Sequence, residues 1–329
     1  MVRLTGLLLP LLCVACAHPT LQDSANHWLS PTLTETAAIM DDGYRLPMRR
    51  WGSENDAVAI LLAIHGFNDY SNAFSGLGTR LAPRGLLTYA YDQRGFGDTT
   101  QRGHWAGTKR LIQDLRQVAA LLRRRHPGLP LYLLGESMGG AVILAAATHS
   151  TTADGFILLA PAVWSRDSMN PLLRLTLWVG THTLPGLKLT GEGIDIQPSD
   201  NLPMLRAFSA DPLVIKATRI DALWGITNLM DNAKRSAGGL RGPVLLLYGE
   251  HDDIIPAHAF CDLLDAMPDR IAGTRLVLYR DGWHMLARDL QGEQVIDDIG
   301  AWLSDVGSPL PSEEETHATS GRIRALCDL

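Results

Sequence analysis

The chain has 329 residues, of which 46% are hydrophobic and 19% charged, and its formal net charge is −6. This length and composition predict one large domain, or a domain with an insertion, that buries a full core. Nucleic acid is not an expected partner, because nucleic-acid-binding domains carry a basic stripe and here 29 basic and 35 acidic residues are spread along the chain.

The first residues have the pattern of a targeting segment. Arg3 supplies a positive charge, and residues 4–15 are almost wholly apolar but too few for a stable transmembrane helix. Residues 12–17, Leu-Cys-Val-Ala-Cys-Ala, resemble the end of a bacterial lipoprotein signal. The resemblance implies a signal peptide over residues 1–16, a lipid on Cys16 that anchors the protein to a membrane, and export to the cell envelope. Ala17 after the cysteine resembles outer-membrane sorting. An ordinary secretory signal cut nearby is the alternative.

A polar tether over residues 17–35 leads into alternating strand and helix patterns. Asp42-Gly43 marks a hairpin between strands at residues 35–40 and 45–51. Further strands are predicted at residues 58–64, 86–91, 131–134, 156–159, 244–248 and 275–279, and helices at 106–125, 138–149, 257–267 and 290–303. Strands this continuously apolar are buried on both faces, so we predict an α/β fold with a mostly parallel sheet flanked by helices.

Residues 164–241 interrupt the alternation. They contain no clear strand and carry Trp164, Trp178, Trp224 and many leucines. We expect a helical cap over the sheet's C-terminal edge, with some of its apolar side chains lining a cavity and most packing onto the core. The cap divides the core into residues 36–163 and 242–306, and the prolines and glutamates of residues 307–329 predict a flexible, solvated tail.

Two cysteines remain once Cys13 is removed with the signal and Cys16 is lipidated. In an oxidising compartment Cys261 and Cys327 can form a disulfide that ties the tail to the body. Two free or buried thiols are the alternative.

Residues 135–139, Gly-Glu-Ser-Met-Gly, close a predicted strand and open a predicted helix. A serine on such a sharp turn is a nucleophile elbow, which exposes the Oγ of Ser137 at the top of the sheet. The flanking glycines let strand and helix pass closely. A glycine-rich turn without chemistry is the alternative.

A serine nucleophile needs a base, usually a histidine oriented by a carboxylate. His284 follows the last predicted parallel strand, and Asp252 and Asp253 follow the strand before it, so both loops emerge at the edge of the sheet where Ser137 lies. His251 is a weaker candidate for the base, because it precedes the acid and lies in the other loop. From position alone, either aspartate can face the imidazole.

The turn His65-Gly66-Phe67 follows another apolar strand. The backbone amides of Phe67 and Met138 are expected to form an oxyanion hole there. A tight glycine turn without a catalytic role is the alternative.

Five segments together resemble an α/β-hydrolase of the monoglyceride lipase and lysophospholipase group over about residues 36–305. They are residues 65–67 (His-Gly-Phe), 91–97 (Tyr-Asp-Gln-Arg-Gly-Phe-Gly), 135–140 (Gly-Glu-Ser-Met-Gly-Gly), 249–252 (Gly-Glu-His-Asp) and 282–284 (Gly-Trp-His). The resemblance implies the α/β-hydrolase fold, selects Asp252 over Asp253 as the acid, and makes Asp92 and Arg94 structural. Glu136 stands where the eukaryotic lipases often have histidine.

The activity that this set implies is hydrolysis of a monoacyl lipid ester, a lysophospholipid or a monoacylglycerol, through an acyl-enzyme on Ser137. Thioester cleavage, removal of an N-terminal proline and acyl transfer use the same triad, and a non-catalytic ligand-binding homologue is a further alternative. No cofactor or metal is expected, because the chain has no H-E-x-x-H, no C-x-x-C pair with ligand spacing and no G-x-G-x-x-G after a first strand.

Overall fold

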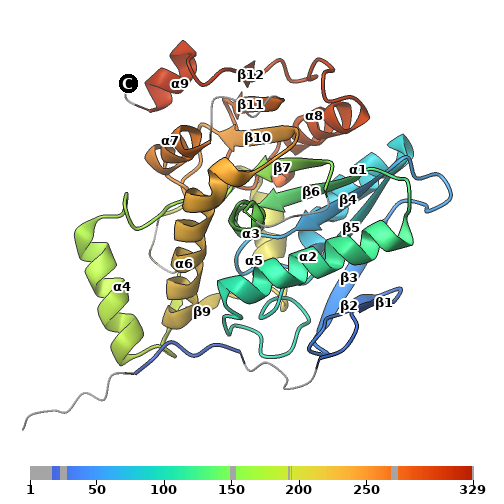
Figure 1. The fold of residues 1–329 in the computed structure, drawn as a ribbon. Coiled ribbons are helices and arrows are strands. Elements are labelled where there is room, and N and C mark those ends of the chain that lie inside the picture. Colours follow the sequence, from blue (N-terminus) through green and yellow to red (C-terminus); the bar gives the residue numbers. More distant parts are fainter. Residues whose placement is uncertain are drawn as a thin grey trace, which may run out of the picture.

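The structure, a computed structural model, describes residues 17–22, 28–148, 153–191, 193, 195–267 and 273–327. Residues 1–16, with the predicted signal peptide and Cys16, lie outside the described residues. A sheet of ten strands runs through the described part of the chain in the order β1-β2-β3-β5-β4-β6-β7-β10-β11-β12 (Figure 1).

The middle of the sheet is parallel. Its strands are β4 (Ala59–Ile64), β5 (Leu86–Tyr91), β6 (Leu131–Glu136), β7 (Gly155–Leu159), β10 (Val244–Gly249) and β11 (Thr274–Tyr279). Every residue of β4, β5, β7 and β10 is buried, as the continuous apolar runs require. The predicted α/β fold with a mostly parallel sheet is confirmed.

Antiparallel strands complete both edges of the sheet. One edge holds β1 (Thr32–Leu33), β2 (Ala37–Ile39) and β3 (Arg45–Trp51), and the other holds β12 (Glu315–Thr316). The predicted hairpin is confirmed, because β2 pairs with β3 across a turn in which Gly43 has a φ of 76°. A residue with a Cβ adopts that conformation only with strain.

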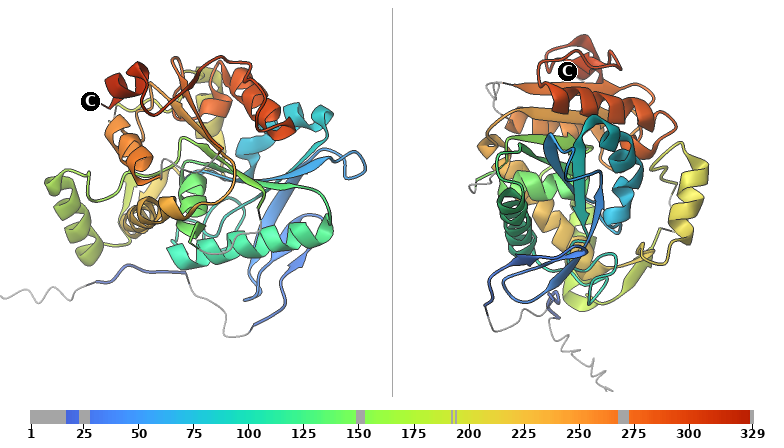
Figure 2. Two further views of the ribbon diagram at one scale, coloured as in Figure 1. Left: turned by 45° about the horizontal axis from the view of Figure 1, so that its top comes forward. Right: turned by 90° about the vertical axis from the view of Figure 1, so that its right-hand side faces the viewer.

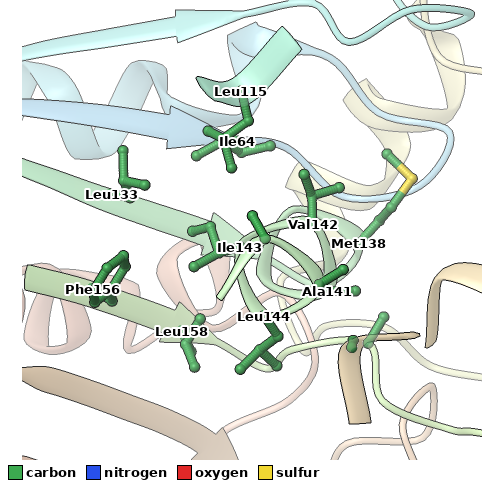
Figure 3. Packing of buried hydrophobic residues seen from close by; sticks show 14 of the residues in the cluster. Ile64, Leu115, Leu133, Met138, Ala141, Val142, Ile143, Leu144, Phe156 and Leu158 are labelled. Carbon is green, nitrogen blue, oxygen red and sulfur yellow. The ribbon is translucent and has the colours of Figure 1, made fainter. Parts of the chain in front are cut away.

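Helices cover both faces of the sheet (Figure 2). The helices α2 (Thr108–Arg125), α3 (Met138–Ala146), α6 (Ile220–Ser236) and α7 (Ala257–Ala266) lie on one face, and α1 (Ser75–Leu81) and α8 (Gly292–Ser304) on the other. Short 3-10 turns are η1 (Ser71–Phe74), η2 (Ala82–Arg84), η3 (Ala237–Gly239) and η4 (Leu286–Arg288). Side chains of β4 point alternately to the two faces of the sheet and so belong to two hydrophobic cores. Ile64 packs on the face covered by α3, where Figure 3 shows it near Leu115 and Val142, and Leu61 packs on the face covered by α1 and α8.

The insertion after β7 differs from the prediction in two ways. It contains α4 (Pro171–Thr183) and α5 (Leu202–Ala210), but also the strands β8 (Lys188–Thr190) and β9 (Ala217–Arg219), which pair with each other, so the expectation of no strand is wrong. Moreover, α6 packs against α3 and joins the core, with Ile226, Leu229 and Ala233 buried. The cap therefore ends near residue 219 rather than 241.

The C-terminal residues pack onto the body, so the expectation of a solvated, flexible tail is wrong for residues 307–327. β12 pairs with β11, and Leu310 and Ile323 are buried. The helix α9 (Gly321–Leu326) ends beside Cys327, which is bonded to Cys261 of α7 in a disulfide with a Cα–Cα distance of 5.9 Å. The exposed edge of β11 needs hydrogen-bonding partners, and the tail supplies them despite its polar composition.

Residues 17–22, the described start of the chain, lie along the cap and the body. The amide of Ala17 donates to the carbonyl of His182 at the end of α4 (3.0 Å), and Leu21 bridges to Trp105. None of the helices in the described ranges is both long and apolar enough to span a membrane.

Candidate active site

Ser137 lies on a strained turn between β6 and α3. Its φ of 50° and ψ of −113° are unusual for a residue with a side chain. A Cβ on Gly139 would lie 1.9 Å from the carbonyl oxygen of Ile64, and one on Gly135 would lie 2.4 Å from the backbone of Gly139. Only glycine fits at these two positions, so the motif holds the serine at the C-terminal edge of the sheet as the sequence predicts.

The predicted base and acid come together. The Nδ1 of His284 donates to Oδ2 of Asp252 at 2.8 Å, and the other carboxylate oxygen accepts the amides of Ile254 (2.8 Å) and Ile255 (2.9 Å). The carboxylate of Asp253 instead accepts the amide of Gln197 in the cap (3.3 Å). The geometry thus selects Asp252, the choice that the family resemblance implied.

The electrostatic surroundings of His284 favour its role as a base. Burial of the imidazole disfavours its charged form, but the carboxylate of Asp252 outweighs this and holds the pKa of His284 above its ordinary value of 6.5. In the described chain Ser137 Oγ makes no hydrogen bond with His284. Catalytic hydrogen bonds of uncomplexed enzymes are often long and shorten when substrate binds.

The other nearby histidines have structural environments. The Nε2 of His65 accepts the amide of Gln93 (2.9 Å) and its Nδ1 donates to the carbonyl of Gly66 (2.8 Å), while burial lowers the pKa of His65. His251 stacks on Trp283, with 5.2 Å between ring centroids. Within the described ranges no group of three or more His, Cys, Asp or Glu side chains is arranged to hold a metal ion.

The loop after β4 runs against the elbow. A Cβ on Gly66 would lie 3.4 Å from the Cβ of Ser137. Neither the amide of Phe67 nor that of the buried Met138 donates a hydrogen bond to another described residue. A buried backbone amide such as that of Met138 rarely lacks a partner. This amide directly after the strained serine, with the amide of Phe67 in the loop that runs against the elbow, fits the predicted oxyanion hole.

The motif around Asp92 and Arg94 is structural. The guanidinium of Arg94 is buried and pairs with Asp42 in the hairpin turn (2.7 Å) and with Asp114 of α2 (2.6 Å). One carboxylate oxygen of Asp92 accepts the amide of Ser71 at 3.0 Å. These bonds hold the loop that follows β5, and none of them involves the triad.

A family model described as serine aminopeptidase, S33 matches residues 55–291, more than half of the chain. The chain belongs to the serine aminopeptidase S33 family. It is 27% identical to the monoacylglycerol lipase of Mycolicibacterium smegmatis, over 84% of this chain and 98% of that protein. It is also 27% identical to the monoglyceride lipase of Rattus norvegicus, over 80% of this chain and 88% of that protein.

Solved structures agree on the fold of this S33-family protein. The monoacylglycerol lipase of Paleococcus ferrophilus superposes with a TM-score of 0.67 at 22% identity, over 80% of this chain and 99% of that chain. A soluble variant of the monoglyceride lipase of Saccharomyces cerevisiae, in complex with a substrate analog, superposes with a TM-score of 0.68 at 20% identity, over 90% of this chain and 98% of that chain. The predicted α/β-hydrolase fold is confirmed.

The S33-family chain also carries a buried charge cluster that sequence reasoning missed. Arg288 lies four residues after His284, and its guanidinium pairs with Glu136 (3.1 Å), the neighbour of Ser137, and with Asp69 (2.8 Å), which follows Phe67 by two residues. The sequence offered one signal, the acidic residue directly before the serine, but none for its partner.

Hydrogen bonds join the cap to the loop that carries His284. We call this set the cap seam; it comprises Met285 N to Pro198 O (3.0 Å), Ser199 Oγ to Asp289 Oδ1 (2.6 Å), Leu290 N to Asp200 Oδ1 (2.8 Å) and Asn201 Nδ2 to Arg288 O (2.9 Å). Asp289 also accepts the amide of Trp283 (2.8 Å), and burial raises its pKa to about 6. The position of the cap and that of the histidine loop are therefore linked.

Apolar side chains of α4 face solvent, where the cap extends away from the sheet (Figure 1). Leu172, Leu175 and Trp178 are 68%, 56% and 51% exposed. Contiguous exposed apolar surface commonly marks a protein, lipid or membrane contact.

Proposed function

We propose that this protein is a serine hydrolase that cleaves the carboxylic ester of a monoacyl lipid, a monoacylglycerol or a lysophospholipid. The observation that carries the proposal is the arrangement around Ser137: a strained serine, two unpartnered amides beside it, and a histidine whose pKa is raised by a carboxylate. The monoacylglycerol lipase of Mycolicibacterium smegmatis, similar over nearly its whole length, supports the substrate class.

In the proposed mechanism Ser137 Oγ attacks the ester carbonyl carbon as Nε2 of His284 takes its proton. The amides of Phe67 and Met138 stabilise the negative oxygen of the tetrahedral intermediate. The protonated imidazole, stabilised by Asp252, then gives its proton to the departing alcohol, which leaves an acyl-enzyme. Water, deprotonated by the same His284, attacks the acyl-enzyme, releases the fatty acid and restores the serine.

The surroundings of the site favour a lipid ester over a peptide. An aminopeptidase binds the free ammonium group of its substrate with unpaired carboxylates. Here the buried carboxylate directly before the serine, that of Glu136, and the one that follows the oxyanion loop, that of Asp69, both pair with Arg288. The leucines and the tryptophan that α4 exposes suit an enzyme whose substrate lies in a membrane.

The first experiment is labelling of the purified protein with a fluorophosphonate, followed by peptide mapping, with Ser137→Ala as the control. We expect stoichiometric modification of Ser137, and a loss of turnover of about 10⁴-fold or more in the alanine variant. No labelling of folded protein would contradict the mechanism and favour a ligand-binding role.

A substrate panel then separates the reactions open to this triad. We expect hydrolysis of monoacylglycerol and lysophosphatidylcholine to exceed that of an acyl thioester and of a prolyl arylamide. Glycerol added as an acyl acceptor distinguishes transfer from hydrolysis. Faster cleavage of the prolyl amide would overturn the lipid assignment while leaving the serine mechanism in place.

We also propose that the protein is exported and anchored by a lipid on Cys16. The Cys261–Cys327 disulfide is typical of oxidising compartments. Ala17, the next residue, is hydrogen-bonded to the C-terminal end of α4, so a lipid on Cys16 would lie near the exposed Trp178 of that helix. Membrane fractionation tests this: we expect wild-type protein in the membrane fraction with an acylated N-terminal peptide, and Cys16→Ala protein without acylation. An unmodified wild-type N-terminus would contradict the anchor.

A further inference from the structure

One guanidinium connects three loops of the site. Arg288 ends η4, four residues after His284, and its side chain is 15% exposed. Its Nη1 lies 2.8 Å from Oδ2 of Asp69, and its Nη2 lies 3.1 Å from both carboxylate oxygens of Glu136. Asp69 follows the oxyanion loop and Glu136 precedes the nucleophile, so a single side chain spans the histidine loop, the oxyanion loop and the elbow.

The charges of this cluster make Arg288 difficult to replace. The side chains of Glu136 and Asp69 are 4% and 5% exposed, and a buried carboxylate without a partner is strongly unfavourable. The planar guanidinium hydrogen-bonds Glu136 and forms an ion pair with Asp69 at the same time, whereas a lysine ammonium acts as a compact point charge. A lysine here would keep the charge but not the bridge.

The cap covers the same guanidinium. The ring of Phe208 on α5 lies over the guanidinium of Arg288, with 5.6 Å between the Cζ atom of Arg288 and the ring centroid. The backbone carbonyl of Arg288 accepts a hydrogen bond from the side chain of Asn201 in the cap seam. Arg288, Phe208 and Asp69 also line a cavity of about 240 Å³ between α5 and the start of α1. Arg288 therefore lies at the junction of the cap with all three loops.

We propose that Arg288 is a positioning residue for acyl transfer, which holds the oxyanion loop and the elbow in register with His284. Its side chain bonds none of Ser137, Asp252 and His284 in the described chain, and it acts through Asp69 and Glu136. The inference rests on the proposed ester hydrolysis at Ser137 and adds the residue that keeps the oxyanion loop, the elbow and His284 aligned. Small displacements of catalytic groups have large effects on the rate, on the order of 100-fold for 1 Å.

The charge of Arg288 also acts on the base. Beside the dominant carboxylate of Asp252, the carboxylate of Glu136 raises the pKa of His284 and the guanidinium of Arg288 lowers it. Within the described residues, these are the three charged groups that act on the imidazole, and they come from the loop after β10, the end of β6 and η4. Loss of the guanidinium is thus expected to move the acid limb of the activity profile to higher pH, and loss of the Glu136 charge to lower pH.

The test compares Arg288→Met with Arg288→Lys, using a soluble short-chain p-nitrophenyl ester. For the methionine variant we expect kcat to fall about 10- to 100-fold with KM changed less than about threefold, and the acid limb of kcat to move to higher pH. For the lysine variant we expect a fall in kcat that is smaller than that of the methionine variant but still more than about twofold, because the bridge is lost, and an unmoved acid limb, because the charge remains. Glu136→Gln should move the acid limb of kcat to lower pH.

Matched controls are Arg206→Met and Arg206→Lys, since Arg206 is exposed on the same cap helix as Phe208. Both should match wild type. If Arg288→Met does not fold, judged by circular dichroism, the lysine variant and Glu136→Gln still test the inference through kcat and the direction of the limb.

Values of kcat within twofold of wild type for either foldable Arg288 variant, or a fall in kcat of the methionine variant with an unmoved limb, would overturn the positioning role. An active wild-type enzyme with these results leaves the ester hydrolysis intact, whereas an inactive, unlabelled wild type overturns both.

Discussion

At the scale of single residues, the raised pKa of His284 sets the pH range in which the enzyme works. The imidazole must be neutral to take the serine proton, and Asp252 holds its pKa above 6.5. We therefore expect kcat/KM to fall as the pH drops, with a midpoint above 6.5. A pH–rate profile with an uncharged short-chain ester measures this directly, and a midpoint at or below 6.5 would show that the aspartate does not govern the base.

The residues of the triad were predictable because each follows a strand end that the sequence marks. Ser137 and His284 stand in motifs, whereas Asp252 and Asp253 are neighbours that position alone could not separate. The structure separates them, since only Asp252 bonds the imidazole. Arg288 escaped prediction because its partner Glu136 lies 152 positions away, and only the folded chain shows which distant charges meet.

At the scale of elements, the ion pairs of Arg94 fasten the β2–β3 hairpin turn and α2 to the loop after β5. Arg94→Met leaves the buried carboxylate of Asp114 without its ion-pair partner and leaves Asp42 with Arg110 alone. We expect the free energy of unfolding to fall by about 3–5 kcal/mol. Urea denaturation measures it, with Arg45→Met, an exposed position on β3, as the control. A loss below about 1 kcal/mol would mean that other contacts hold these elements.

The predicted elements were most accurate where one apolar pattern extended over a whole strand or helix. β5 has the predicted bounds, and α2 begins two residues late. The helix α1 was missed because its seven residues include two glycines, and β8 and β9, of three residues each, are too short to show alternation. The assignment of α6 to the cap was wrong because an amphipathic helix has the same pattern wherever its apolar face is buried.

At the scale of the whole molecule, the disulfide joins the C-terminal segment to α7 across 66 positions. Reduction, or Cys327→Ser, is expected to lower the stability by up to about 4 kcal/mol through the entropy of the unfolded chain. Activity at 25 °C should persist, because neither cysteine touches the triad. Thermal melting with and without reductant checks this, and the serine variant should no longer respond to reductant. Identical melting temperatures would show that β12 and α9 hold the tail without the bond.

The cap seam has a consequence for substitutions in the cap. An outward movement of the cap at residues 198–201 breaks hydrogen bonds to the loop that carries the base. The cap and the loop of the general base therefore share one set of hydrogen bonds, so a displacement of either is expected to affect the other. By this linkage, substitutions in the cap that weaken the seam are expected to disturb the histidine loop as well, although they lie far from His284 in the sequence.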